Sequence, residues 1–346
     1  METQNDEHGL IPSGTFSLTP KDDIMEVLIP DLFRSILSVD PVQNPNYEQV
    51  KKEADRWIAK TLAYGKSEAY RNSRADFAYL VSWWAPHCDA EALRTMVDWQ
   101  HWFDEGYLKD DVFQAAKDII QTLSILDDSY PLISRDENPL AHAFQVSWQS
   151  FKKRASPQLQ HRYKDYIKHY MLGVLGQVHA RQFDVATLSI DDYMYFRRRT
   201  IGVMPCTVLV EYALGIDLPD HVINHQSLKD CREVAVDLKQ GEELSIIGIL
   251  RAQGLSLQDA MDEAGRMLDA CYQRWHNAVA TMPSWGPVLD RRVLMYLDGL
   301  RNIVLGSLLW SFWTGRYFDK EEGRRVRETR VLGIPIRLGT LKPSER

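Results

Sequence analysis

The feature that most constrains the fold of this chain is a helical spacing of apolar residues that recurs along most of its length. Within residues 46–62, for example, Val50, Ala54 and Ile58 fall on one side of a helix. The same analysis predicts helices over 46–62, 90–103, 111–126, 138–154, 157–181, 190–203, 205–213, 226–239, 244–252, 257–280 and 286–318. No run alternates apolar and polar residues as a half-exposed strand would. The connections are short and carry Pro, Gly or Asp, so the sequence predicts one all-α domain with helices packed round a common centre.

The two ends of the chain differ from this helical region. Residues 1–20 are polar with Gly and Pro, which predicts a flexible tail. Residues 21–318 form the predicted helical domain, and residues 319–346 are a basic segment with little pattern. With 346 residues, 45% of them hydrophobic, the chain can bury a large core.

Charge and cysteine content narrow the class of protein. The net charge of −7 does not suggest a nucleic-acid partner. No apolar run reaches the roughly 18 residues of a membrane span, and the first residues are too polar for a signal peptide. The four cysteines show no metal-binding or redox spacing. We therefore expect a reduced, cytoplasmic protein without a membrane span.

A cluster of three arginines, Arg197 to Arg199, precedes Gly202 and Pro205. Three adjacent cations on a helix cannot share a face, because successive residues turn by about 100°. Gly202 lets the backbone deform, and Pro205 is expected to stop an ordinary helix shortly after. The cluster is therefore either a helix C-terminus capped by Arg and Gly or a clamp for a phosphate group.

The segment Arg197-Arg198-Arg199-Thr200-Ile201-Gly202 resembles the "R-R-x-T-I-G" segment of fungal class I terpene synthases, the sesquiterpene synthases of mushrooms. The resemblance runs from about residue 30 to residue 318. Three further matches follow in the family's order: Ile216-Asp217-Leu218-Pro219-Asp220-His221-Val222, Gln253-Gly254-Leu255-Ser256-Leu257-Gln258-Asp259-Ala260, and Trp310-Ser311-Phe312 with Arg316-Tyr317-Phe318. Each match alone is weak evidence for the family, but the order and spacing of the matches together are specific to it.

The resemblance implies a helical bundle around a central cavity. It also implies Mg²⁺-dependent ionisation of farnesyl diphosphate and cyclisation to a sesquiterpene, with up to three Mg²⁺ ions. Arg198 would be the diphosphate-sensing arginine, and Gly202 the effector glycine whose carbonyl faces the forming cation. Arg316 and Tyr317 would be further diphosphate donors.

Aromatic residues are candidates for the wall of that cavity, because aromatic faces stabilise a carbocation. Trp310, Trp313 and Tyr317 fall at i, i+3 and i+7, which places them on one face of the predicted helix 286–318. The wall candidates are Trp99, Trp102, Phe103, Phe196 and Trp310. Ordinary core packing remains open for each of them.

The first metal motif departs from the family pattern. Asp98-Trp99-Gln100-His101-Trp102 passes directly into Phe103-Asp104-Glu105-Gly106. Asp104 and Glu105 match the end of the family's "D-D-x-x-D-E-G", and the leading aspartate pair is missing. About seven residues, roughly two helical turns, would have been lost. Asp104 and Glu105 remain candidate metal ligands.

The second motif, "N-D-x-x-S-x-x-x-E" in the family, is also incomplete. One alignment leaves its Asn and Ser without a counterpart. A gap-free alignment places Lys229, Glu233 and Asp237 on the three ligand positions, and a lysine cannot bind Mg²⁺. Glu233 and Asp237 share a face at i, i+4 and could hold one cation, or they could be two solvated carboxylates.

The sequence thus predicts a Mg²⁺-dependent sesquiterpene cyclase with impaired activity. An alternative stays open: a non-catalytic homologue, or a product of altered splicing or truncation, that at most binds a prenyl diphosphate.

Overall fold

The computed structural model describes residues 24–105, 112–180, 189–240, 244–315 and 317–335, and this part of the chain is largely helical. The helices are α1 (Tyr47–Thr61), α2 (Lys66–Ala75), α3 (Phe77–Ser82), α4 (Ala90–Glu105), α5 (Val112–Ile125), α6 (Pro139–Lys152), α7 (Pro157–Ala180), α8 (Ile190–Thr200), α9 (Val203–Leu214), α10 (Asp220–Ile223), α11 (Gln226–Gln240), α12 (Leu244–Ala252), α13 (Leu257–Ala280), α14 (Pro287–Trp313) and α15 (Lys320–Thr329). The all-α prediction is confirmed. Most predicted helices begin and end within a few residues of their expected positions, whereas α2, α3, α10 and α15 were not predicted.

A two-stranded antiparallel sheet, which the sequence analysis did not expect, joins the two ends of the described chain. Strand β1 (Ile24–Leu28) pairs with β2 (Val331–Pro335) so that Ile24 lies opposite Pro335 and Leu28 opposite Val331. The side-chain amide of Gln258 on α13 donates to the Leu28 carbonyl at 3.0 Å and accepts from the Leu28 N–H at 2.9 Å. At five residues each, the strands are too short for a clear alternation.

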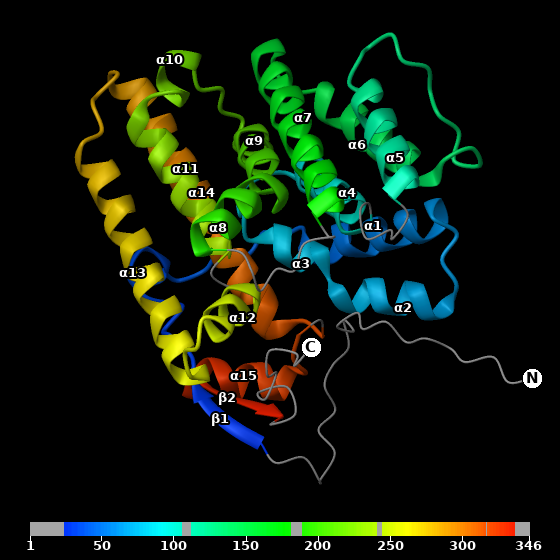
Figure 1. Cartoon of the computed structure of the whole chain (residues 1–346). Helices are drawn as coiled ribbons and strands as arrows, with labels where there is room; N and C mark the ends of the chain where they lie inside the picture. The colour runs from blue at the N-terminus through cyan, green and yellow to red at the C-terminus, as the bar shows by residue number, and fades with distance from the viewer. Residues whose placement is uncertain (1–23, 106–111, 181–188, 241–243, 316, 336–346) are drawn as a thin grey trace, which may run out of the picture.

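The basic C-terminal segment is folded where the structure describes it. Asp319 caps α15 by accepting from the N–H groups of Glu321 and Glu322. Gly323 lies against the carbonyl of Phe312, where a Cβ atom would overlap the backbone of α14. The segment therefore packs on the helical domain through α15 and β2 (Figure 1).

The long helix α14 forms the centre of the bundle and contacts α3, α9 and α11. Its length and apolar composition would let it cross a membrane, but 72% of its apolar window is buried inside the fold. Such burial is typical of the core helix of a globular protein. Close packing depends on Gly299, where a Cβ atom would overlap Val210 of α9.

A buried ion pair fixes α9 to α7. Arg162 of α7 donates from one terminal nitrogen to both carboxylate oxygens of Glu211, at 2.8 and 2.6 Å. Its other terminal nitrogen donates to the Leu218 carbonyl at 2.8 Å. Burial raises the pKa of Glu211, and the guanidinium of Arg162 opposes that shift. This pair anchors the end of α9 that lies away from Gly202.

The four cysteines are free and buried.

Candidate functional site

The helix break predicted beside the arginines lies between α8 and α9. Gly202 adopts φ +73° and ψ 9°, in the left-handed region that glycine enters without steric cost. Pro205 does not stop a helix, as the sequence analysis expected. It lies in the first turn of α9, where the missing N–H would have had no partner within the helix. The Gly202 carbonyl accepts a hydrogen bond from the Cys206 thiol at 3.2 Å.

An aromatic row packs against this break. A Cβ atom on Gly202 would overlap the ring of Phe103. Phe103 stacks on Trp99 with ring centroids 5.2 Å apart, and its centroid lies 5.3 Å from that of Tyr170 on α7. Two of the predicted wall residues, Trp99 and Phe103, thus lie together beside the predicted effector glycine.

The other wall candidates lie in different surroundings. Trp102 is buried with its ring centroid 4.5 Å from that of Phe144 on α6, so it belongs to the packed core as well as contacting Trp99. Phe196 is partly exposed on α8, where its ring meets Tyr195 at 5.9 Å. For these two residues the structure favours core packing and surface packing, respectively.

Arg198 forms a bidentate ion pair with Asp237 of α11. Its Nε and one terminal nitrogen donate to the two carboxylate oxygens at 2.7 and 2.8 Å. Arg274 of α13 donates to the same carboxylate at 2.6 Å, and its other terminal nitrogen lies 3.6 Å from Glu233. The hydrogen bond to Asp237 raises the pKa of Arg198. Three helices therefore meet at one carboxylate.

Burial distinguishes the two carboxylates. The Asp237 side chain is 1% exposed and that of Glu233 is 54% exposed. Asp237 is therefore neither a free metal ligand nor a solvated acid, the two alternatives that the sequence left open. Cys271 is also close, since Asp237 and Arg274 both act on its thiol, whose pKa burial raises to about 11.

The α11 side of this site does not fit a Mg²⁺ ion. Mg²⁺ binds hard oxygen ligands at about 2.0–2.1 Å in near-octahedral geometry. Both oxygens of Asp237 already accept charged N–H groups, and Glu233 is paired with Arg274. Across the described residues, no three His, Cys, Asp or Glu side chains form a group that could hold a metal. The side chains of Asp104 and Glu105 lie outside the described residues.

Arg274 was missed by the sequence analysis. Its neighbours Tyr272 and Trp275 are buried, which indicates that this part of α13 faces the bundle. An arginine there must find a partner or reach solvent. In the sequence, only these two aromatic neighbours marked Arg274, because its partner Asp237 lies on a different helix.

The C-terminal motif is arranged differently from the prediction. Helix α14 ends at Trp313, and Thr314 turns to an extended conformation with ψ 159° while its hydroxyl donates to the Trp310 carbonyl. Tyr317 therefore lies beyond the helix rather than on its face. Its ring still meets that of Trp310 edge-on, with centroids 5.7 Å apart. Trp310 is buried and stacks on Phe77, and Tyr317 is exposed. Arg316 lies outside the described residues.

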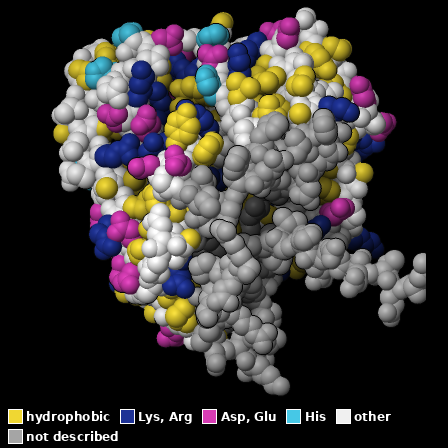
Figure 2. Space-filling model, in the orientation of Figure 1, with side chains coloured by type: hydrophobic (Ala, Val, Ile, Leu, Met, Phe, Trp, Pro, Cys, Tyr) yellow, Lys and Arg dark blue, Asp and Glu magenta, His cyan; other side chains and the backbone are white. Residues whose placement is uncertain are grey.

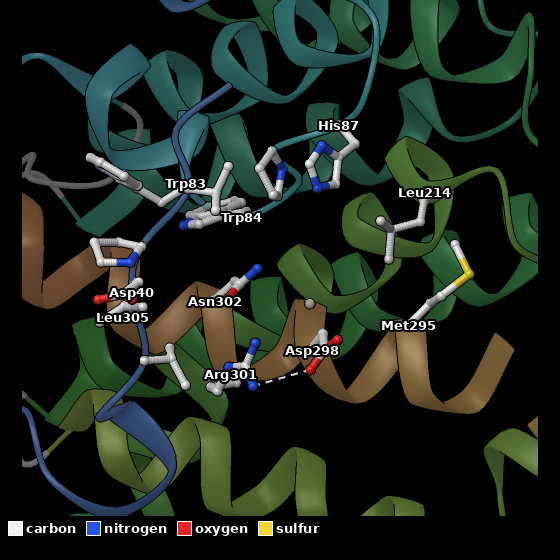
Figure 3. A pocket seen from close by; sticks show the side chains of 15 residues that line it. Asp40, Trp83, Trp84, His87, Leu214, Met295, Asp298, Arg301, Asn302 and Leu305 are labelled. Atoms are coloured by element: carbon white, nitrogen blue, oxygen red, sulfur yellow. Dashed lines mark ion pairs between the residues drawn. The ribbon is translucent and has the colours of Figure 1, made fainter. Parts of the chain in front are cut away.

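A cavity of about 210 Å³ lies away from all of these residues. It is bounded by residues 39–42, the segment after α3 and the middle of α14. Asn302 points between Trp84 on one side and Arg301 on the other, and Arg301 pairs with Asp298 at 3.1 Å (Figure 3). Leu214 at its edge ends α9, about 18 Å of helix from Gly202. The sequence analysis named no residue of this cavity.

The surface over α11 and α13 carries both signs of charge. Lys and Arg side chains alternate there with Asp and Glu on the face shown in Figure 2. Alternation of this kind gives no broad cationic patch of the type that tracks a nucleic-acid backbone.

Comparison with known proteins places this geometry in context. The family model for terpene synthase family 2, C-terminal metal binding, matches residues 96–274. The (+)-eremophilene synthase of Gibberella fujikuroi is 41% identical over 344 residues, which cover 93% of this chain and 96% of that protein. A second protein of the same fungus, named as an inactive (1R,4R,5S)-(-)-guaia-6,10(14)-diene synthase, is 38% identical over 354 residues, covering 92% and 88%.

The fold also matches solved structures. The crystal structure of α-eudesmol synthase superimposes with a TM-score of 0.71 at 20% identity, covering 79% of this chain and 96% of that one. At this identity the likeness concerns the fold alone.

Proposed function

This chain belongs to the terpene synthase family, and we propose that it binds farnesyl diphosphate and cyclises it to a sesquiterpene only slowly. The observation that carries the proposal is the site at the α8–α9 break. Gly202 sits in the left-handed conformation against Phe103, and Arg198 lies four residues before it on α8. These positions support a diphosphate role for Arg198 and a cavity-wall role for Phe103.

The chemistry requires positive charge at one end of the substrate and a dry aromatic surface at the other. The diphosphate leaves as a highly charged anion, so cations and N–H donors must stabilise it as the C–O bond breaks. We propose that Arg198, Arg316 and Tyr317 hold the leaving diphosphate. Trp99 and Phe103 would face the carbocation, which aromatic faces stabilise. In the family, bound Mg²⁺ neutralises much of the diphosphate charge.

Slow turnover follows from the state of Asp237. A site that keeps its arginines but lacks ligands for metal ions still attracts the diphosphate in the ground state. It loses the charge stabilisation that grows in the transition state, which determines the rate. Because Asp237 is occupied by Arg198 and Arg274, we expect binding to persist and ionisation to be weak.

A second candidate function, binding of a prenyl diphosphate without turnover, is favoured by the same occupied carboxylate. The relative named inactive matches this chain at nearly the same identity and coverage as the (+)-eremophilene synthase. Membership of the family therefore leaves the activity of a given chain open. Sequencing the transcript would test the splicing alternative, through in-frame segments between Trp102 and Asp104 and after Leu238.

The main experiment incubates the purified protein with farnesyl diphosphate and Mg²⁺ and analyses the volatile products. Geranyl and geranylgeranyl diphosphates serve as chain-length controls. We expect binding of farnesyl diphosphate in calorimetry and little cyclised product. A single cyclised sesquiterpene formed at about 10⁻² s⁻¹ or faster would contradict the slow-turnover proposal. Absence of product together with firm binding would support the second candidate.

The role of Arg316 is tested separately. Arg316→Ala should weaken pyrophosphate binding by on the order of 1.5–3 kcal/mol, because one charge-assisted contact is lost. Arg325→Ala is the matched control, since Arg325 lies on α15 and donates to the Val331 carbonyl at 3.4 Å. Equal affinities of the two variants would count against a diphosphate role for Arg316.

A further inference from the structure

We infer that the guanidinium groups of Arg198 and Arg274, bridged by Asp237, supply the positive charge on the α11 side of the site, so that this side binds diphosphate without a metal ion. The inference rests on the proposed function, because it concerns the same diphosphate. It differs in assigning to Arg274 a part that the family leaves to Mg²⁺.

The first step of the argument is the occupancy of Asp237. A carboxylate offers about four lone-pair positions to hydrogen-bond donors. Three charged N–H contacts, at 2.7, 2.8 and 2.6 Å, already reach the Asp237 oxygens. About one position remains, and a Mg²⁺ ion there would lie beside two guanidinium cations that repel it. A Mg²⁺ ion that displaced a guanidinium would take that arginine's partner. Both outcomes disfavour Mg²⁺ at Asp237 while the two arginines hold its carboxylate.

The second step is the direction in which the arginines are exposed. Asp237 is 1% exposed, and the side chains of Arg198 and Arg274 are 39% and 41% exposed. The carboxylate thus lies behind the two cations, and an approaching anion meets guanidinium groups first. Each guanidinium has five N–H donors, of which Arg198 gives two to Asp237. Donors remain for phosphate oxygens.

The third step is preorganisation. Arg198, Asp237 and Arg274 come from α8, α11 and α13, so the shared carboxylate holds two arginines from separate helices side by side. Fixing the side chains before binding reduces the conformational entropy lost when the ligand binds. Planar guanidinium groups also match phosphate oxygens in bidentate geometry.

Charge balance sets a limit on this site. The two arginines and Asp237 sum to one positive charge, and Glu233 partly offsets it from 3.6 Å at the exposed side of Arg274. The pair therefore replaces only part of the charge that several Mg²⁺ ions would bring. It suits binding of a diphosphate better than rapid ionisation, as the proposed slow turnover requires.

Calorimetry with inorganic pyrophosphate tests the inference, with and without EDTA. Wild-type protein should bind pyrophosphate in EDTA. Arg274→Gln should weaken that binding about 10- to 100-fold, because a charge-assisted contact and the bridge are lost. The matched control is Arg266→Gln, since Arg266 lies on the same helix, is mostly exposed and pairs with Glu263. Its affinity should equal that of the wild type.

Two further measurements separate the outcomes. Arg274→Lys keeps the charge and its pairing with Asp237, so it should fold and bind in EDTA with reduced affinity even if Arg274→Gln is unstable. Adding Mg²⁺ to Arg274→Gln should restore part of the affinity, because Glu233 loses its cationic partner and Asp237 loses one of its two, which leaves carboxylate oxygens for the ion.

The inference is overturned if wild-type binding disappears in EDTA, or if Arg274→Gln and Arg274→Lys both bind as tightly as the wild type. If pyrophosphate still binds in the presence of Mg²⁺ in either case, the proposed function survives. If pyrophosphate and farnesyl diphosphate bind under no condition, the proposed function fails as well.

Discussion

Replacing Gly202 by alanine tests whether the helix break is fixed by the glycine and by Phe103 together. Two costs are expected from the structure. A residue with a Cβ atom in the left-handed region costs about 1–2 kcal/mol, and Gly202 has φ +73°. The new methyl group would also overlap the Phe103 ring, and overpacking of this kind costs about 1–3 kcal/mol. We therefore expect Gly202→Ala to destabilise the fold by about 2–5 kcal/mol.

Gly215→Ala separates the two costs. Gly215 has φ +62°, and a Cβ atom there would meet nothing within 4 Å. Only the backbone cost of about 1–2 kcal/mol should appear. The free energies of unfolding are measured by urea titration followed by far-UV circular dichroism.

A double-mutant cycle completes the test. Phe103→Leu removes the ring edge that the new methyl group would meet, so Gly202→Ala should cost about 1–3 kcal/mol less in that background. If Gly202→Ala costs the same as Gly215→Ala, and Phe103→Leu does not change its cost, the ring does not fix the break. That result would refute the reasoning.

Three further predictions concern buried charges, and each is checked by urea unfolding. Arg162→Met should cost about 3–5 kcal/mol because it leaves Glu211 buried and unpaired, and adding Glu211→Leu should recover part of the loss. Burial, outweighing Arg94, raises the pKa of Asp98 to about 7. The folded protein thus favours the neutral acid, so the stability of the wild type relative to Asp98→Asn should fall as pH rises from about 4 to about 7. Burial lowers the pKa of His101 to about 3, so the stability of the wild type relative to His101→Leu should fall as pH drops from about 6.5 to about 3. Identical pH profiles for variant and wild type would contradict either titration argument.

Local patterns predicted the helices well, because an amphipathic spacing is a property of neighbouring residues. The break between α8 and α9 was placed nearly correctly, since Gly202 carries the left-handed conformation within the chain itself. The prediction that Pro205 stops a helix was wrong, because it lies in the first turn of α9. Proline disrupts a helix interior but is accepted in a first turn, and where α9 begins depends on Gly202.

Contacts between residues far apart in the sequence determine the features that the sequence analysis missed. The end of α14 at Trp313 separates Tyr317 from the predicted helix face, and Gly315 just beyond it lies against the guanidinium of Arg74. The partner of Asp237 on α13 is 37 residues away in sequence, and no local spacing connects Asp237 with Arg274. The metal assignment for Glu233 and Asp237 came from alignment with the family motif and from their helical spacing. The spacing places them correctly on one face, but it does not tell which cation binds there.

The pairing of β1 with β2 has a consequence for synthesis of the protein. Ile24 leaves the ribosome early, and its partner Pro335 is made roughly 300 residues later, which takes about 15–60 s at ordinary elongation rates. During that interval the first strand has no partner, and Gln258, which also holds Leu28, is made only when about three-quarters of the chain is complete. The N-terminal strand must therefore wait for nearly the entire polypeptide before it can be secured. A nascent chain stalled before residue 331 would expose an unpaired strand edge to other chains.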